Sequence, residues 1–243
     1  MKELRAILLD IEGTVTPISF VHEILFPYAR EHVNNYLSQH FNQPDVQDDI
    51  TKLREEQASD TEELRQPPID SIATVVTYVD RLIDLDRKSP GLKSLQGKIW
   101  KAGYDDGSLK SPVYSDVIEA FERWRTAGIL INIFSSGSVL AQQLLFAHTE
   151  AGDLTLYINQ YFDTSIGKKM DPQSYRVIAS KLSFDPTQVL FVSDVVGELT
   201  AANSSGMQTR LCIRPGNPPQ PESRFETITS FNGLSLLPRS EAL

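Results

Sequence analysis

The sequence predicts an α/β protein in which a doubly wound parallel sheet carries an inserted all-helical domain. Two observations indicate this fold. Short apolar runs typical of buried parallel strands occur at 6–9 and again, alternating with amphipathic helices, after residue 110. The stretch between them is charged and helical in its periodicity. We therefore expect an α/β core made of residues 1–16 and 110–243, with a helical insertion at 17–109 that follows the first strand.

Composition narrows the class of protein. The chain has 243 residues, 40% hydrophobic and 23% charged, which is ordinary for a globular protein with a sizeable core. A net charge of −9 and a pI near 5.0 argue against a nucleic-acid-binding protein. Cys212 is the only cysteine, so an intrachain disulfide and a cysteine-rich metal site are excluded. No signal segment or membrane-spanning run is visible, and we expect a cytoplasmic monomer that binds neither membrane nor nucleic acid.

The N-terminal half is predicted as one strand and four helices. The strand is the apolar run Ala6–Leu9. Pro27 suits the first turn of a helix that extends to about residue 41, because a missing N–H costs little there. The other helices are an acidic, exposed one at 46–64, one at 69–85 that includes the strand-like run 72–76, and one at 92–100. Pro67-Pro68 and Ser89-Pro90-Gly91 end the first two of these.

The C-terminal half alternates between helix and strand. Helices are expected at 113–125, 139–147, 171–182 and 196–205, and strands at 129–134, 161–164, 189–192 and 209–213, with a candidate edge strand at 227–231. This alternation is typical of a parallel sheet with helices on both faces.

A pair of carboxylates, Asp10 and Glu12, follows the first strand. Their side chains point the same way if the extended conformation persists, because side chains alternate along a strand. Gly13 then permits a sharp change of direction. Ligands of open parallel sheets bind beyond the carboxyl ends of the strands, where this pair is expected. Taken alone, the segment is explained equally well as an ordinary polar turn.

Other polar side chains are expected at the same edge of the sheet. They follow the strands at 129–134 and 189–192 or precede the helix at 171–182, and they are Ser135, Ser136, Asp194, Glu198, Lys168 and Lys169. Each has a structural explanation by itself, as a helix cap or a solvated charge pair. Their common position at one edge favours a functional site.

These residue types suit phosphoryl transfer with Mg²⁺. Carboxylates are hard oxygen ligands for that ion, while hydroxyls, loop amides and a lysine can bind phosphate. An aspartate such as Asp10 can form an aspartyl phosphate, and an acid such as Glu12 can protonate the leaving oxygen and then activate water.

The order of these residues resembles the four motifs of haloacid-dehalogenase-like phosphohydrolases. The matching positions are Asp10-x-Glu12-Gly13-Thr14, Ser135 or Ser136, Lys169 and Asp194. Most members of that superfamily have Asp where this chain has Glu12. That glutamate, together with the segments 86–97, 134–139 and 193–195, is similar to the enolase-phosphatases of methionine salvage (acireductone synthases) over nearly the whole chain.

The resemblance implies a Mg²⁺-dependent phosphoric monoester hydrolase that also has enolase activity. Its substrate would be 2,3-diketo-5-methylthiopentyl 1-phosphate. The enzyme would enolise this substrate and then remove phosphate through an aspartyl phosphate, giving the acireductone 1,2-dihydroxy-3-keto-5-methylthiopentene. The helical insertion would close over the α/β core as a cap that excludes water.

The resemblance also implies a role for each residue. Asp10 would be the nucleophile and a metal ligand, Glu12 the acid/base and a ligand through its backbone carbonyl, and Asp194 a further ligand. Ser135 and Ser136 would bind substrate. Lys169, three residues after Ile166, would stabilise the phosphoryl group, with Lys168 as the alternative. Lys88, Lys93 or Gln96 of the insertion would orient the diketone, and the enolisation base stays open between Glu12 and a residue of the insertion.

Two other functions fit parts of the pattern. One is another phosphatase or phosphonatase of the same superfamily with a different small phosphorylated substrate. The other is a non-catalytic phospho-ligand binder, or a switch resembling a receiver domain. The large insertion and Glu12 argue against this second possibility, because a receiver needs neither.

Overall fold

The computed structural model describes residues 3–60, 67–85, 87 and 89–234. Contacts divide the chain into two compact units, one formed by Met1–Phe20 with Lys110–Leu243 and the other by Val21–Leu109. We call them the core unit and the helical unit. No helix of the described ranges is both long and apolar enough to cross a membrane.

The core unit contains a six-stranded parallel sheet. Its strands are β1 Ala6–Leu9, β2 Leu130–Phe134, β3 Ile158–Phe162, β4 Val189–Ser193, β5 Gln208–Cys212 and β6 Thr227–Ile228. They lie in the order β3-β2-β1-β4-β5-β6, and every neighbouring pair is parallel. This doubly wound order confirms the predicted fold class. It reverses between β1 and β4, and the crevice at such a reversal is where ligands bind.

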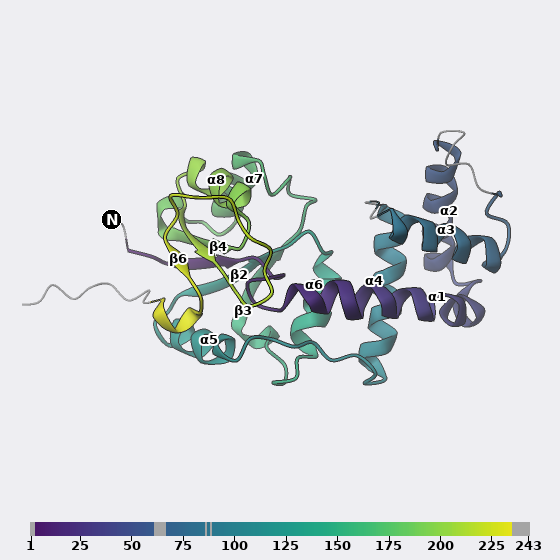
Figure 1. Cartoon of the computed structure of the whole chain (residues 1–243), viewed down its shortest axis with the longest axis horizontal. Helices are drawn as coiled ribbons and strands as arrows, with labels where there is room; N and C mark the ends of the chain where they lie inside the picture. Colours follow the sequence, from purple (N-terminus) through teal and green to yellow (C-terminus); the bar gives the residue numbers. More distant parts are fainter. Residues whose placement is uncertain (1–2, 61–66, 86, 88, 235–243) are drawn as a thin grey trace, which may run out of the picture. The chain divides into compact units, whose positions relative to one another are not determined.

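Helices cover both faces of the sheet (Figure 1). They are α5 Asp116–Thr126, α6 Val139–Ala147, α7 Pro172–Lys181 and α8 Val196–Ser204. On one face, Ala6 and Leu8 of β1 pack in a buried cluster with Tyr175 of α7 and Leu199 of α8. On the other, Phe121 of α5 stacks near Phe146 of α6, with 6.5 Å between ring centroids. β1 is fully buried, which explains its continuous apolar run.

Two edge strands differ from the prediction. β3 begins at Ile158, three residues before the predicted 161. The prediction missed this start because Asn159 and Gln160 interrupt the apolar pattern of the strand. A bulge at that point shifts its register against β2. β6 pairs with β5 only through Thr227 and Ile228, and the chain then forms the short 3₁₀ helix η5 Phe231–Gly233.

The helical unit consists mainly of α1 Phe26–His40, α2 Pro44–Ala58, α3 Ile72–Asp84 and α4 Pro90–Asp105. The ambiguous run 72–76 is helical, and Ser71 begins α3 with a capping box to Thr74. The π-helix η1 Phe20–Leu25, which precedes α1, was not predicted.

Two predictions for the helical unit were wrong. α2 is not simply exposed, because Val46, Ile50 and Leu53 form a buried face toward α4. The helix expected at 92–100 instead runs from Pro90 to Asp105, because Ser89 Oγ accepts the Leu92 N–H at 3.1 Å and caps it. A methyl group at Gly91 would lie 3.0 Å from the Asp49 carbonyl oxygen, so glycine permits this close helix packing.

Candidate active site

A tight turn after β1 presents Asp10 and Glu12. The Asp10 N–H donates to the Val192 carbonyl at 3.0 Å, which continues the β1–β4 ladder one residue beyond β1. The Ile11 carbonyl then accepts three N–H groups, from Thr14 at 3.2 Å, Val15 at 2.8 Å and Thr16 at 3.0 Å. We call residues 10–16 the catalytic turn. Its hydrogen bonds fix the two carboxylates at the point where the strand order reverses.

Gly13 allows the catalytic turn to approach β4 closely. Its φ is +70°, a conformation that favours glycine. A methyl group there would lie 2.6 Å from Asp194 Oδ2, closer than any side chain can be placed. The catalytic turn and the residue that follows β4 therefore meet, as the sequence predicted for the carboxyl ends of these strands.

Lys169 lies between two buried carboxylates. Its Nζ is 2.5 Å from Asp10 Oδ1 and 2.8 Å from Glu198 Oε2. Burial alone would lower the lysine pKa, but the charges of Asp10 and Glu198 raise it above its usual value. The Tyr175 hydroxyl of α7 donates to the Lys169 carbonyl at 2.7 Å and so holds the lysine backbone. Lys168, by contrast, is exposed.

Burial and the charge of Asp10 change the pKa of the two acids near β4, Asp194 and Glu198. Both effects raise the pKa of Asp194 to about 7 and that of Glu198 to about 7. Ser193 Oγ donates to Glu198 Oε2 at 2.9 Å, which orients the glutamate toward Lys169. Negative charge is therefore in excess at this edge of the sheet, with Lys169 as the cation among these groups.

Glu12 faces the loop after β2. Ser135 Oγ donates to Glu12 Oε2 at 3.4 Å, and burial together with the charge of Asp10 raises the pKa of Glu12. The same Ser135 Oγ accepts the Gly137 N–H at 3.0 Å. Ser136 is exposed in the same loop. The structure thus brings Asp10, Glu12, Ser135 and the lysine together, as expected.

Comparison with known proteins defines the family. A haloacid dehalogenase-like hydrolase domain matches residues 4–206 of the chain. The chain belongs to the haloacid dehalogenase-like hydrolases. It is 50% identical over 232 residues to Enolase-phosphatase E1 of Synechococcus elongatus, covering 95% of this chain and 98% of that protein. It is 44% identical to Enolase-phosphatase E1 of Drosophila melanogaster, covering 95% and 92%.

Other relatives extend this hydrolase comparison. An Arabidopsis thaliana protein, called a probable bifunctional methylthioribulose-1-phosphate dehydratase/enolase-phosphatase E1, is 45% identical over 95% of this chain and 48% of its own length. The crystal structure of the UTR4 protein of Saccharomyces cerevisiae superimposes with a TM-score of 0.80 at 36% identity, covering 96% of this chain and all of that one. CbbY from Rhodobacter sphaeroides, at 14% identity and a TM-score of 0.59, shares the fold.

Hydrolases of this family generally use a divalent metal, and the donor atoms of this chain suit one. No three Asp, Glu, His or Cys side chains of the described residues form a metal cluster by themselves. Asp10 and Asp194 instead provide two buried carboxylates. The Glu12 carbonyl accepts no hydrogen bond from the described parts of the chain, so it is a free third oxygen donor. A divalent cation would offset the effects of burial and of the Asp10 charge, which together raise the Asp194 pKa.

Three of the predicted substrate-binding residues belong to the insertion. Lys88 lies outside the described residues. Lys93 and Gln96 belong to α4 of the helical unit, where Gln96 is buried. Cys212 is buried, and burial raises its pKa to about 12, as expected for an inert core thiol.

Gln142 is a residue that sequence reasoning missed. Its buried side chain in α6 donates to the Gly137 and Phe162 carbonyls, both at 2.9 Å, and so ties the loop after β2 to the end of β3. The pair Gln142-Gln143 in the mainly apolar run 139–147 was the available signal. Gln142 thereby supports the loop that carries Ser135 and Ser136.

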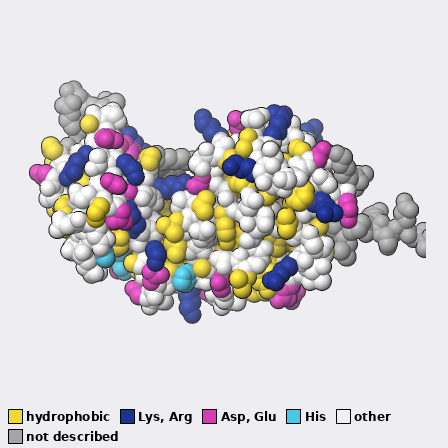
Figure 2. Space-filling view, turned by 180° about the vertical axis from the view of Figure 1, so that it is seen from behind, with side chains coloured by type: hydrophobic (Ala, Val, Ile, Leu, Met, Phe, Trp, Pro, Cys, Tyr) yellow, Lys and Arg dark blue, Asp and Glu magenta, His cyan; other side chains and the backbone are white. Residues whose placement is uncertain are grey.

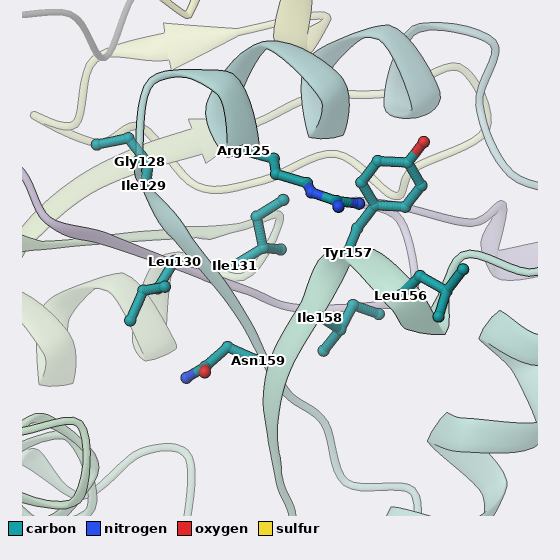
Figure 3. A pocket seen from close by; sticks show the side chains of 9 residues that line it. All are labelled: Arg125, Gly128, Ile129, Leu130, Ile131, Leu156, Tyr157, Ile158 and Asn159. Carbon is teal, nitrogen blue, oxygen red and sulfur yellow. The ribbon is translucent and has the colours of Figure 1, made fainter.

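A pocket of the core unit lies apart from these residues (Figure 3). Its lining residues lie at the amino ends of β2 and β3, whereas Asp10 and Asp194 follow the carboxyl ends of β1 and β4. Arg125 lies over the Tyr157 ring, with 5.5 Å from its Cζ to the ring centroid. It contains none of the predicted site residues.

Proposed function

We propose that this hydrolase is an enolase-phosphatase that converts 2,3-diketo-5-methylthiopentyl 1-phosphate to an acireductone and phosphate in methionine salvage. The observation that supports this most strongly is the 50% identity to an Enolase-phosphatase E1 across 95% of the chain. The cluster of Asp10, Lys169 and Glu198 supports the phosphatase half of the reaction, because it places a carboxylate beside a fixed positive charge.

Asp10 is proposed as the nucleophile of the phosphatase step. One of its carboxylate oxygens attacks phosphorus, a P–O bond to Asp10 forms, and the ester P–O bond to the substrate breaks. Lys169, 2.5 Å from Asp10 Oδ1, is placed to offset charge on the phosphoryl oxygens. Ser135 and Ser136 are proposed to bind the substrate from the loop after β2.

Glu12 is proposed as the acid and then the base. Its raised pKa favours the protonated form that can donate to the leaving enol oxygen. The resulting carboxylate can then take a proton from the water that hydrolyses the aspartyl phosphate, which restores Asp10 and releases phosphate. Glu12 thus acts as the acid in the first half-reaction and as the base in the second.

We propose Mg²⁺ as the metal, held by Asp10, Asp194 and the Glu12 carbonyl, because all three are hard oxygen donors. When bound, it would supply Lewis-acid polarisation of the diketone for enolisation and neutralise phosphate charge. Lys88, Lys93 and Gln96 are proposed to orient the diketone. The protein is proposed to act as a cytoplasmic monomer without a nucleic-acid partner; on the face in view, Figure 2 shows Lys and Arg interspersed with Asp and Glu.

An assay with the diketone phosphate tests this function. Free phosphate and the acireductone are followed together, with Mg²⁺ present and with the metal removed by a chelator, and a generic aryl phosphate serves as the comparison substrate. The proposal expects both products in equal amounts, only with metal, and faster than aryl phosphate turnover. Phosphate release from aryl phosphate without acireductone formation would instead indicate a phosphatase of the same superfamily with another substrate.

A further inference from the structure

The segment after β5 forms a turn that reaches the catalytic turn. Residues 214–217 read Arg-Pro-Gly-Asn, and the Asn217 N–H donates to the Arg214 carbonyl at 3.1 Å. Gly216 has a φ of +87° after a proline, the arrangement of a type II β-turn. The sequence therefore fixes the backbone between Arg214 and Asn217, two polar residues that contact the same part of the molecule.

Arg214 and Asn217 donate to consecutive carbonyls of the catalytic turn. Arg214 Nε donates to the Thr14 carbonyl at 3.1 Å, and Asn217 Nδ2 donates to the Gly13 carbonyl at 2.9 Å. These contacts join positions about two hundred residues apart in the chain. The next two carbonyls are also paired: that of Val15 accepts the Tyr114 N–H at 3.0 Å, and that of Thr16 accepts the Gly13 N–H at 2.8 Å. With the two side-chain bonds, each carbonyl from Gly13 to Thr16 accepts a hydrogen bond.

The Arg214 side chain is itself held rigidly. It is 4% exposed, and its Nη1 lies 2.9 Å from both carboxylate oxygens of Asp116. Its guanidinium is sandwiched between the rings of Tyr114 and Phe231, with 4.4 and 4.6 Å from Cζ to the ring centroids. A guanidinium that is paired, stacked and desolvated in this way has one available orientation. It therefore serves as a fixed donor to Thr14.

Asn217 faces the proposed metal ligands with its other atom. A methyl group at Gly13 would lie 2.6 Å from Asp194 Oδ2 and 2.9 Å from Asn217 Oδ1, so the two oxygens border the same small space. Asn217 Oδ1 is buried and has no partner among the described residues. A buried oxygen without a hydrogen-bond partner beside Asp194 costs free energy unless the occupied site provides a hydrogen-bond donor.

We propose that Arg214 and Asn217 are positioning residues of the active site. By holding the Thr14 and Gly13 carbonyls they fix the peptide groups that directly follow Glu12, so that the Glu12 carbonyl, with Asp10 and Asp194, would be available to hold the divalent metal. The inference rests on the proposed metal site. It assigns to the turn after β5 a role in metal affinity in addition to its role in packing.

Metal titration of Asn217→Ala tests the proposal. Calorimetric titration with Mg²⁺ measures the Kd of the folded protein without substrate, and the melting temperature is recorded for the same samples. We expect the Kd to rise roughly 10- to 100-fold, as loss of a group that orients metal ligands typically causes. At saturating Mg²⁺ we expect kcat to fall while KM for the substrate stays nearly unchanged, because Asn217 is not among the residues proposed to bind the substrate.

Arg214→Lys provides a second variant that keeps the positive charge beside Asp116. A single ammonium cannot reproduce the guanidinium's bonds to both Asp116 and Thr14, so the Kd should rise here too. This variant decides the question if Asn217→Ala does not fold. Arg123→Ala is the matched control, because Arg123 Nη2 donates to the Phe231 carbonyl at 2.9 Å, in the segment that packs on Arg214, without contact to the catalytic turn.

The outcomes separate the inference from the function on which it rests. A raised Kd in Asn217→Ala or Arg214→Lys, with the unaltered Kd in Arg123→Ala, supports it. Lower melting temperatures with the unaltered Kd in both variants would show that the turn after β5 serves stability alone, and would overturn it. Failure of the unaltered protein to bind Mg²⁺ would overturn the proposed metal site, and the inference with it.

Discussion

At the scale of single residues, the active site depends on which of two adjacent lysines reaches Asp10. Lys169 Nζ lies between Asp10 and Glu198, while Lys168 is exposed. The resemblance to the family pattern favoured Lys169, but the neighbouring lysine has the same charge and length, so Lys168 stayed open as the alternative. The structural reason for the difference is that Tyr175 holds the Lys169 carbonyl and Ser174 Oγ holds that of Lys168, at 2.7 and 2.8 Å.

Lys169→Met should reduce phosphate release on the order of 100- to 1000-fold, the usual cost of removing one group that stabilises charge in the transition state. Lys168→Met is the matched control and should keep the activity of the unaltered protein. Initial rates with the diketone phosphate and with aryl phosphate measure both. Normal turnover by Lys169→Met together with loss in Lys168→Met would reverse the assignment.

Gly13→Ala should destabilise the core through two separable effects. A left-handed conformation costs an alanine about 1–2 kcal/mol, and the new methyl would also meet Asp194 Oδ2 at 2.6 Å. Gly128→Ala isolates the first effect, because Gly128 has a φ of +73° and no atom within 4 Å of the added methyl. Urea denaturation should therefore show a larger loss of unfolding free energy for Gly13→Ala. Equal losses would mean that Asp194 moves away without cost.

At the scale of elements, sequence periodicity predicted the buried interior better than the edges. β1 and β4 begin where they were expected, because their neighbours bury them and the apolar pattern is continuous. α6 also begins at the expected residue, where Ser138 caps it. β3 was misplaced because a sheet edge with a bulge tolerates Asn159 and Gln160. α2 was taken as exposed because one apolar face of Val46, Ile50 and Leu53 is narrow among many acidic residues.

The helix α4 carries the proposed substrate contacts of the helical unit. Gln96→Ala should lower kcat/KM for the diketone phosphate on the order of 10-fold, the worth of about one hydrogen bond, while aryl phosphate turnover stays unchanged. Lys101→Ala, on the same helix and paired with Asp105 at 2.6 Å on the surface, is the control for general effects on α4. Equal losses on both substrates in Gln96→Ala would show that this residue does not recognise the diketone.

At the scale of the whole molecule, the sequence predicted which strand ends meet but not what supports them. Asp10, Ser135 and Asp194 were expected together because carboxyl ends of parallel strands share an edge. Gln142, Arg214 and Asn217 could not be assigned this way, since they contact the loops of the site through backbone carbonyls. Such contacts depend on three-dimensional placement and leave no residue pattern. The Arg-Pro-Gly-Asn turn was visible in the sequence, but not its target.

The proposed reaction consists of two chemically distinct steps, of which only the second needs Asp10 as nucleophile. Asp10→Asn tests it most directly. The amide is nearly isosteric, so the fold should survive, but it is a far poorer nucleophile. The variant is studied at high Mg²⁺, because removal of one carboxylate weakens metal binding, and bound Mg²⁺ is verified by titration.

Proton exchange at C1 of the diketone phosphate in deuterated water reports enolisation, and a phosphate assay reports hydrolysis. We expect Asp10→Asn to continue to exchange the C1 protons and to accumulate the enol phosphate, while no free phosphate appears. Persisting phosphate release would contradict Asp10 as the nucleophile. Loss of both exchange and release with Mg²⁺ bound would contradict the separation of the two steps.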